Sequence, residues 1–198
     1  MTEKEKAAAG YLYNANHDPE ILKDIMSCGD LCHQYNQLRP TQLAEKGEVL
    51  KKIIANQGED VCVFGPFWCD YGYNITIGNH FFANRNCQFL DGGKITFGDY
   101  VFIAPNCCFT TAEHALDVEQ RNEGLEVALP ITIGNNVWIG AGVTVLGGVT
   151  IGDNTVIAAG SVVTKDIPSG VLAAGVPCRV LREITEADKE KYQRYIGE

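Results

Sequence analysis

The sequence predicts a mainly β protein: a parallel β-helix solenoid with an N-terminal α-helical cap and a short C-terminal helix. Three observations lead to this prediction. A six-residue pattern recurs between residues 75 and 166, glycine is concentrated in the same region, and the first 57 residues instead space their apolar side chains as helices do. We therefore expect a cap at residues 1–58, the β-helix at residues 59–182 and a C-terminal helix at residues 183–198.

Helix-start signals place two helices within the cap. Asp18 followed by Pro19 is a favourable start, because an Asp side chain accepts hydrogen bonds from the free amides and proline fits the first helical position. A second helix is expected to begin after Pro40, with Thr41 as its cap.

Two cysteines of the first cap helix admit two interpretations. Cys28 and Cys32 are one helical turn apart and His33 follows directly, an arrangement that would fit part of a metal site. No second ligand pair of the CxxC type completes such a site, which favours ordinary helix packing.

The six-residue pattern alternates apolar residues and then turns at Gly followed by Asn or Asp. Period two inside period six describes a short strand followed by a sharp corner, and such coils must stack to bury their apolar face. An antiparallel sheet would instead turn every 8 to 12 residues or so, without a strict six-residue period. The apolar column expected to face inward consists of Ile77, Ala83, Phe89, Phe97, Ile103, Phe109, Ile133, Ile139, Val145, Ile151, Ile157 and Val163.

The repeat is interrupted by a polar excursion at residues 110–130. A rigid scaffold that projects a long polar loop usually does so for binding or catalysis, and the alternative is a loop that covers a subunit edge. His114 lies in this loop among carboxylates, and imidazole is the side chain best suited to accept a proton near neutral pH. His114 is therefore the candidate base, ahead of His17 and His33 in the cap and His80 at a corner.

Composition excludes several classes of partner. The chain has 16 Lys and Arg against 25 Asp and Glu, a net charge of -9, so nucleic acid and anionic membranes are not expected as partners. No apolar run is long enough to span a membrane, and the polar start does not resemble a signal peptide, so we expect a cytoplasmic protein with reduced cysteines. Cys87 and Cys107 occupy apolar positions of the repeat and are expected to be buried.

Four stretches resemble the maltose and galactoside O-acetyltransferases among the hexapeptide-repeat acyltransferases. They read AGYLY at residues 9–13, DYGYNI at 70–75, PITIGNNVWIG at 130–140 and VTKDIPSGVLAAGVPCR at 163–179. With the cap and the loop, the resemblance covers nearly the whole chain. It implies a left-handed β-helix, transfer of an acetyl group from acetyl-CoA to a sugar hydroxyl without a required metal, and a homotrimer with active sites at the subunit interfaces.

The resemblance also implies roles for individual residues. His114 would accept the proton of the attacking hydroxyl and later protonate the departing thiolate, without an acetyl-enzyme. We add the hypothesis that Glu126 orients or charges His114, the alternative being a solvated loop carboxylate. Asn84 is counted with the catalytic residues and, with Asp70, matches acceptor positions of the family; Asp91 is expected to be a third sugar ligand. Gly92 stands where some relatives carry an acid, which leaves the preferred sugar open.

On the coenzyme side, the resemblance points to the main-chain amide of Ala141 for the oxyanion and to Trp138 for packing on the pantetheine arm. Cations are scarce in this chain, so those after the last coils fit a local phosphate site. Alternatively, Arg179 and Arg182 only keep a C-terminal helix solvated. The expected coenzyme set comprises Trp138, Ala141, Ala159, Thr164, Lys165, Arg179 and Arg182.

Three other functions remain to be weighed. A zinc enzyme of the γ-carbonic anhydrase type would need three suitably placed histidines, and the loop offers His114 alone. A hexapeptide-repeat acetyltransferase acting on an antibiotic, an amino acid or a nucleotide sugar would share the coil and the base. A scaffold without activity is disfavoured by the joint presence of His114, Trp138 and Lys165.

Overall fold

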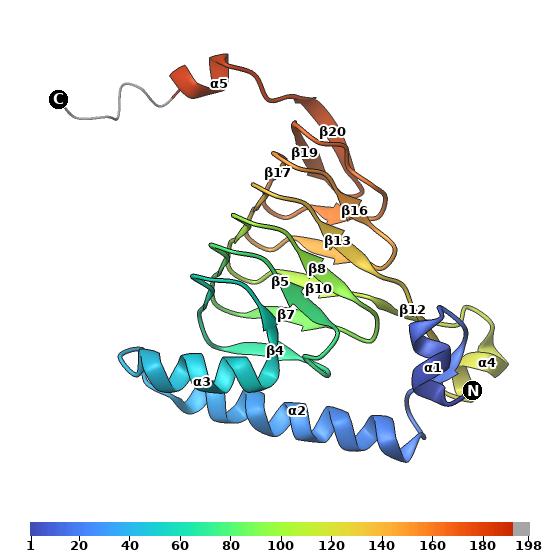
Figure 1. Cartoon of the computed structure of the whole chain (residues 1–198). Coiled ribbons are helices and arrows are strands. Elements are labelled where there is room, and N and C mark those ends of the chain that lie inside the picture. Colours follow the sequence, from blue (N-terminus) through green and yellow to red (C-terminus); the bar gives the residue numbers. More distant parts are fainter. Residues whose placement is uncertain (192–198) are drawn as a thin grey trace.

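The computed structural model describes residues 1–191 and consists of a β-solenoid whose first coils are covered by helices (Figure 1). The helices α2 (Pro19–Gln37) and α3 (Leu43–Ile53) lie across the N-terminal end of the solenoid, while α1 (Glu3–Ala8) and α4 (Val118–Asn122) lie to one side. None of the helices within residues 1–191 combines the length and apolarity needed to cross a membrane. The predicted architecture of parallel β-solenoid and helical cap is confirmed.

Parallel strands form the three faces of the solenoid within the described residues. The first face contains β2 (Asn56–Gln57), β5 (Ile75–Ile77), β8 (Ile95–Phe97), β13 (Ile131–Ile133) and β16 (Thr150–Ile151). The second face contains β4 (Phe67–Cys69), β7 (Cys87–Leu90), β10 (Cys108–Thr110), β15 (Thr144–Leu146) and β18 (Val162–Val163). The third face contains β3 (Cys62–Val63), β6 (Phe82–Ala83), β9 (Phe102–Ile103), β14 (Trp138–Ile139), β17 (Val156–Ile157), β19 (Val171–Gly175) and the antiparallel β20 (Cys178–Glu183).

The predicted inward column forms the core of the solenoid. Every residue of that column is at most 2% exposed. Partners on neighbouring coils stack directly, for example Phe89 with Phe109 and Ile133 with Ile151. Cys87 and Cys107 are also buried, as predicted. The core therefore follows from the sequence period alone, because only alternate residues of each short strand can face inward.

One row of corners is held by a ladder of side-chain oxygens. At each Gly-Asp or Gly-Asn corner, the Asx oxygen accepts the backbone N–H of the equivalent residue one coil earlier: Asp99 from Asn79 at 2.7 Å, and Asp153 from Asn135 at 2.6 Å. The preceding glycines are needed for this close approach, because a Cβ on Gly134 would lie 2.3 Å from Asp153 Oδ1. The left-handed backbone at these corners is instead adopted by residues such as His80 and Asn136.

Gly134→Ala is expected to destabilise the protein by about 2–3 kcal/mol, because the added methyl group must displace Asp153 and break its rung of the ladder. Gly47→Ala is the matched control. Gly47 lies within α3 and has open space where the alanine methyl would stand, so alanine should be neutral or stabilise by up to about 1 kcal/mol. Urea unfolding of both variants checks the difference, and equal midpoints would contradict the role of the ladder.

The helix starts and the C-terminal end differ in part from expectation. Asp18 caps α2 as predicted and accepts from two backbone amides. Thr41 does not cap α3: a turn closed by the Gln42 N–H and the Arg39 carbonyl carries the chain past Thr41, and α3 begins at Leu43. At the other end, residue 183 ends β20 and the described helix α5 (Ala187–Glu190) begins at Ala187, later than the expected start at residue 183. The expectation for residues 192–198 lies outside the described residues.

Candidate active site

The excursion at residues 110–130 is a folded hairpin rather than an irregular loop. Strands β11 (Ala112–His114) and β12 (Leu125–Ala128) pair antiparallel, and β1 (Tyr13–Asn14) pairs with β12. Glu126 is the direct cross-strand partner of both His114 and Tyr13. Because directly paired residues project from the same face of a sheet, the three side chains form one row, Tyr13–Glu126–His114.

This row brings the predicted base next to the predicted carboxylate. His114 Nε2 lies 3.9 Å from Glu126 Oε2, an ion-pair distance, and the His114 side chain is 53% exposed while that of Glu126 is 12% exposed. Glu126 is thus the buried member of the pair and His114 the exposed one, so Glu126 is not a solvated loop carboxylate. The imidazole keeps an open side toward solvent, where an acceptor hydroxyl could approach.

Tyr13 is a member of the row that the sequence analysis did not single out. Its hydroxyl donates a hydrogen bond to Glu126 Oε1, and the side chain is only 1% exposed. Burial raises the pKa of the Tyr13 hydroxyl, and the hydrogen bond to Glu126 raises it further. The hydroxyl therefore stays a donor and fixes the carboxylate. Tyr13 is the last residue of the AGYLY stretch, but no local sequence pattern indicates that β1 pairs with β12.

Gly92 leaves the space that Tyr13 fills. A Cβ on Gly92 would lie 3.0 Å from the Tyr13 hydroxyl oxygen, closer than van der Waals contact allows. A larger side chain at position 92 would therefore push Tyr13 away from Glu126. Gly92, where some relatives carry an acid, thus makes room for the buried side chain of Tyr13.

Asp91 has no exposed surface with which to contact a sugar ligand. It is fully buried, and its Oδ1 accepts from the backbone N–H groups of Asp70 at 3.0 Å and Tyr71 at 2.8 Å, with Asn74 at 3.3 Å from Oδ2. Burial raises the pKa of Asp91 to about 6, although these amides lower it. The expectation that Asp91 contacts the sugar directly is therefore wrong: its buried carboxylate accepts hydrogen bonds that hold the turn at residues 70–74.

Asp91→Ala is expected to cost about 3–5 kcal/mol of stability, because three backbone amides lose their acceptor inside the protein. Asp91→Asn keeps an oxygen for the Asp70 and Tyr71 amides and should cost less than about 2 kcal/mol. Thermal unfolding compares the two variants. If Asn rescued neither stability nor acceptor binding, the anchoring role of the hydrogen bonds would be wrong.

Asp70 joins the acceptor side to the base. Its carboxyl group is half-buried, and its pKa is raised to about 7, first by burial and then by the negative charges of Asp91 and Glu126. Glu126 lies near enough for its charge to act on Asp70, so the turn at residues 70–74 and the hairpin are close together. With a pKa of about 7, the Asp70 carboxyl group is protonated in part of the molecules near neutral pH, so it can donate a hydrogen bond to a hydroxyl as well as accept one.

The predicted residues are divided between two edges of the solenoid. Asp70, Asp91, Lys165 and the hairpin that carries His114 follow strands of the second face. Residues on the next edge, which follow strands of the third face, are Asn84, Ala141 and Ala159. A single chain therefore does not bring Asn84 and Ala141 together with His114.

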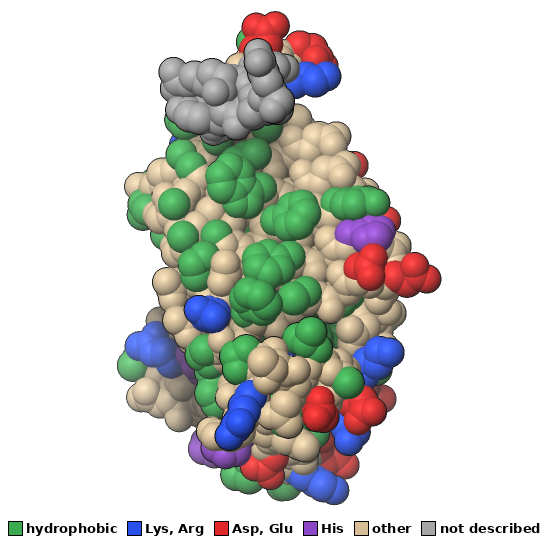
Figure 2. Space-filling view, turned by 90° about the vertical axis from the view of Figure 1, so that its left-hand side faces the viewer, with side chains coloured by type: hydrophobic (Ala, Val, Ile, Leu, Met, Phe, Trp, Pro, Cys, Tyr) green, Lys and Arg blue, Asp and Glu red, His purple; other side chains and the backbone are tan. Residues whose placement is uncertain are grey.

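An exposed apolar row crosses the third face. Trp138 is 53% exposed and points outward, as the strand alternation predicts. Its direct partners on neighbouring coils are Phe102 and Val156, and the register continues through Leu172 to Arg182. Hydrophobic side chains gather over the middle of the face seen in Figure 2. The row therefore runs from an apolar surface to a cationic end.

The two C-terminal arginines lie on a strand. Arg179 and Arg182 belong to β20, which returns antiparallel along β19, and not to a C-terminal helix. Arg182 forms a two-pronged ion pair with Asp188 at 2.6 and 2.7 Å, and Arg179 donates to the carbonyl of Cys178. Thr164 and Lys165 are exposed at the edge after β18.

Comparison with known proteins identifies the family. Residues 6–58 match the family model "maltose acetyltransferase hexapeptide capping motif", and residues 130–165 match "bacterial transferase hexapeptide (six repeats)". A candidate acetyltransferase of Saccharomyces cerevisiae is 50% identical over 93% of this chain and 94% of its own length.

Two solved structures are similar over nearly their whole length. A maltose O-acetyltransferase from Clostridium difficile 630 is 46% identical with a TM-score of 0.91, covering 93% of this chain and 98% of that one. A galactoside acetyltransferase in complex with coenzyme A is 43% identical with a TM-score of 0.92, covering 96% and 94%. Identity of this extent across cap, coils and hairpin shows that the chain is an acetyltransferase of the hexapeptide-repeat acyltransferases and belongs to the maltose and galactoside O-acetyltransferase family.

Proposed function

We propose that the protein transfers an acetyl group from acetyl-CoA to a hydroxyl of a sugar acceptor of the galactoside, maltose or glucose type. The observation that carries the proposal is the row Tyr13–Glu126–His114, which places a fixed carboxylate beside an exposed imidazole. A general base supported in this way is what a weakly acidic sugar hydroxyl needs as it attacks a thioester.

In the proposed mechanism, His114 accepts the hydroxyl proton while the acceptor oxygen bonds to the thioester carbonyl carbon. Glu126 stabilises the imidazolium that forms, and Tyr13 keeps Glu126 in place. The Ala141 backbone amide is proposed to stabilise the oxyanion. His114 then returns the proton to the sulfur as the carbon–sulfur bond breaks, which regenerates neutral imidazole without an acetyl-enzyme.

The distribution of residues over two edges supports active sites between subunits. A site that combines His114 with Asn84 and Ala141 needs the hairpin edge of one chain against the next edge of another. Such a contact joins two different surfaces and closes as a ring, and a three-sided solenoid suits a ring of three. We therefore propose a homotrimer, which sedimentation equilibrium would test. A cytoplasmic location, without nucleic acid or membrane partners, remains a prediction.

The apolar row of the third face fits the coenzyme. Its exposed aromatic surface at Trp138 suits a pantetheine arm, and its end at Arg182, near Arg179 on the same strand, suits phosphates. Acetyl-CoA would supply the activated thioester at this surface. Ala159, Thr164 and Lys165 are proposed to complete the coenzyme site, with Lys165 exposed on the edge after β18.

Arg179→Ala is expected to raise the KM for acetyl-CoA about tenfold while leaving the KM for the acceptor sugar within about twofold, because a charge-assisted phosphate contact contributes roughly 1.5 kcal/mol. Initial rates over both substrates measure the two constants. Arg39→Ala, on the exposed turn before α3, is the control for loss of a surface arginine. An unchanged KM for acetyl-CoA would contradict the phosphate role.

A panel of acceptors tests the proposed function. Release of free thiol from acetyl-CoA is measured with galactosides, maltose and glucose, and separately with aminoglycosides, amino acids and nucleotide sugars. The proposal requires turnover with at least one of galactosides, maltose and glucose. No aminoglycoside, amino acid or nucleotide sugar should react faster than that sugar. Turnover only with the second group would instead support the alternative, a hexapeptide-repeat acetyltransferase for another acceptor class.

A further inference from the structure

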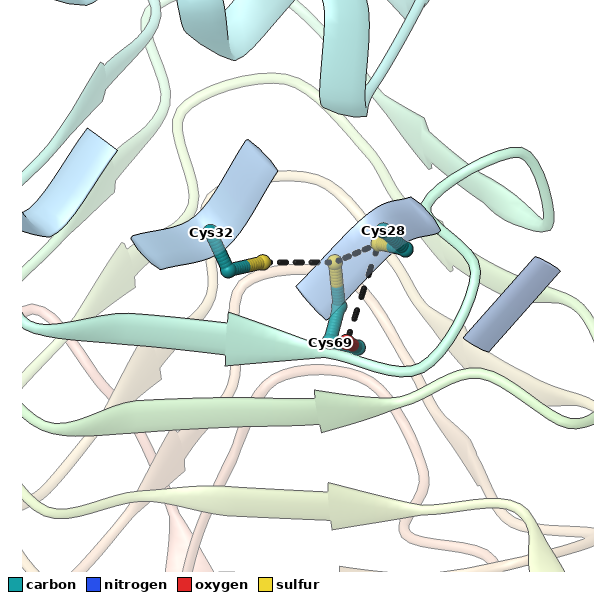
Figure 3. A group of neighbouring side chains, drawn as sticks. All are labelled: Cys28, Cys32 and Cys69. Atoms are coloured by element: carbon teal, nitrogen blue, oxygen red, sulfur yellow. Dashed lines mark hydrogen bonds between the residues drawn. The ribbon is translucent and has the colours of Figure 1, made fainter. Parts of the chain in front are cut away.

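Three cysteine sulfurs meet where the helical cap covers the solenoid (Figure 3). Cys28 and Cys32 come from successive turns of α2, and Cys69 is the last residue of β4. The Cys69 sulfur lies 3.5 Å from that of Cys28 and 3.8 Å from that of Cys32, and Figure 3 shows it between the other two. All three sulfurs lie within 4.8 Å of one another.

The cluster is enclosed by protein. Cys28, Cys32 and Cys69 are 4%, 0% and 7% exposed, and none of them forms a disulfide. His33, the partner considered from sequence, is exposed and does not belong to the group. The third thiol is instead supplied by a residue far along the chain, which no local ligand spacing could indicate.

We propose that Cys28, Cys32 and Cys69 form a buried three-thiolate site for one soft metal ion, with Cu(I) as the ion that fits it. The spacing of the sulfurs supports this. For sides of 3.5, 3.8 and at most 4.8 Å, the point equidistant from the three sulfurs lies at most about 2.4 Å from each, which is close to the ~2.3 Å typical of a metal–thiolate bond. The ligands would bind without rearrangement of the backbone.

The number and kind of ligands decide between metals. Thiolate sulfur selects Cu(I), zinc and iron–sulfur clusters over harder ions. Structural zinc takes four ligands, whereas the group found among residues 1–191 offers three, enclosed away from water. Three-coordinate Cu(I) is satisfied by this set. Binding replaces the thiol protons with the metal, so up to three protons are released per ion and no oxidation is involved.

The site would tie the cap to the acceptor turn. Two of its ligands are on α2, while Cys69 directly precedes Asp70, whose amide is held by Asp91. A metal bound at this point links α2 to the solenoid and stabilises the folded state to the extent that it binds the preformed site more tightly than the thiols of the unfolded chain. This consequence can be measured without reference to acetyl transfer.

The test is an anaerobic titration of the reduced full-length protein with Cu(I) against a chromogenic Cu(I) chelator. We expect one ion to be retained per chain and the unfolding temperature to rise. Cys28→Ala should lose at least tenfold in retention and show no rise in temperature. Cys107→Ala, which removes a buried thiol of the core outside the cluster, and Cys62→Ser, which removes an exposed one, should both behave as the wild type.

Equal retention by the wild type and Cys28→Ala would overturn the proposal. If Cys28→Ala fails to fold, X-ray absorption of the wild type loaded with one equivalent of Cu(I) decides the question. Three sulfur neighbours at about 2.3 Å support the site. Two sulfur neighbours, or nitrogen and oxygen neighbours, reject it, as would zinc displacing Cu(I) at equal concentration.

Discussion

His114→Ala is expected to lower kcat for acetyl transfer by about three to four orders of magnitude, because no other group in the row can take the proton of the attacking hydroxyl. Glu126 is held by Tyr13 and is largely buried, so its carboxylate cannot substitute for the imidazole. The thiol released from acetyl-CoA at saturating acceptor measures the effect.

Binding of coenzyme A separates loss of chemistry from loss of structure. The His114→Ala protein should bind coenzyme A with nearly unchanged affinity, because the proposed coenzyme residues lie on the third face and at the edge after β18, outside the hairpin. His33→Ala, which removes an exposed imidazole from α2, is the matched control and should retain full activity. A kcat for His114→Ala within about tenfold of the wild type would reject the base assignment.

Glu126→Gln is expected to lower kcat by about two orders of magnitude with little change in either KM. The amide keeps the size of the side chain and its hydrogen bond from Tyr13, but it removes the charge that stabilises the imidazolium 3.9 Å away. The loss should therefore appear in the chemical step. Steady-state kinetics, with unfolding measured in parallel, checks this result.

Tyr13→Phe distinguishes the charge of Glu126 from its position. Phenylalanine fills the same buried space but cannot donate to Glu126, so we expect a loss of about tenfold or less in kcat. In the double variant the two effects should not add, since Tyr13 acts through Glu126. Full additivity, or a kcat for Glu126→Gln within about threefold of the wild type, would show that the row does not act as a unit.

The fold was predictable because its order is local. A period of two within a period of six fixes which residues face inward, and the buried column from Ile77 to Val163 follows from that rule without knowledge of any contact. The start of α2 at Asp18 was equally local, since a cap acts on the next three residues. Thr41 shows the limit: a turn closed by a neighbouring residue was enough to move the start of α3.

The site was predictable only in part. His114 and Glu126 are neighbours, as the hypothesis of a carboxylate partner requires, but a sequence cannot show that β1 crosses to the hairpin and brings Tyr13 against Glu126. Asp91 was misassigned for a related reason. Whether a carboxylate meets a ligand or backbone amides depends on how the turn at residues 70–74 folds over it.

The sequence by itself determined the coiled architecture, the interruption at residues 110–130 and the histidine within it, because periodic patterns and breaks in them are properties of neighbouring residues. The tertiary structure alone decided which distant residues share a site: Tyr13 with Glu126, and Cys69 with Cys28 and Cys32. Such meetings depend on how strands and helices pack across the fold, and packing joins residues whose separation along the chain carries no signal.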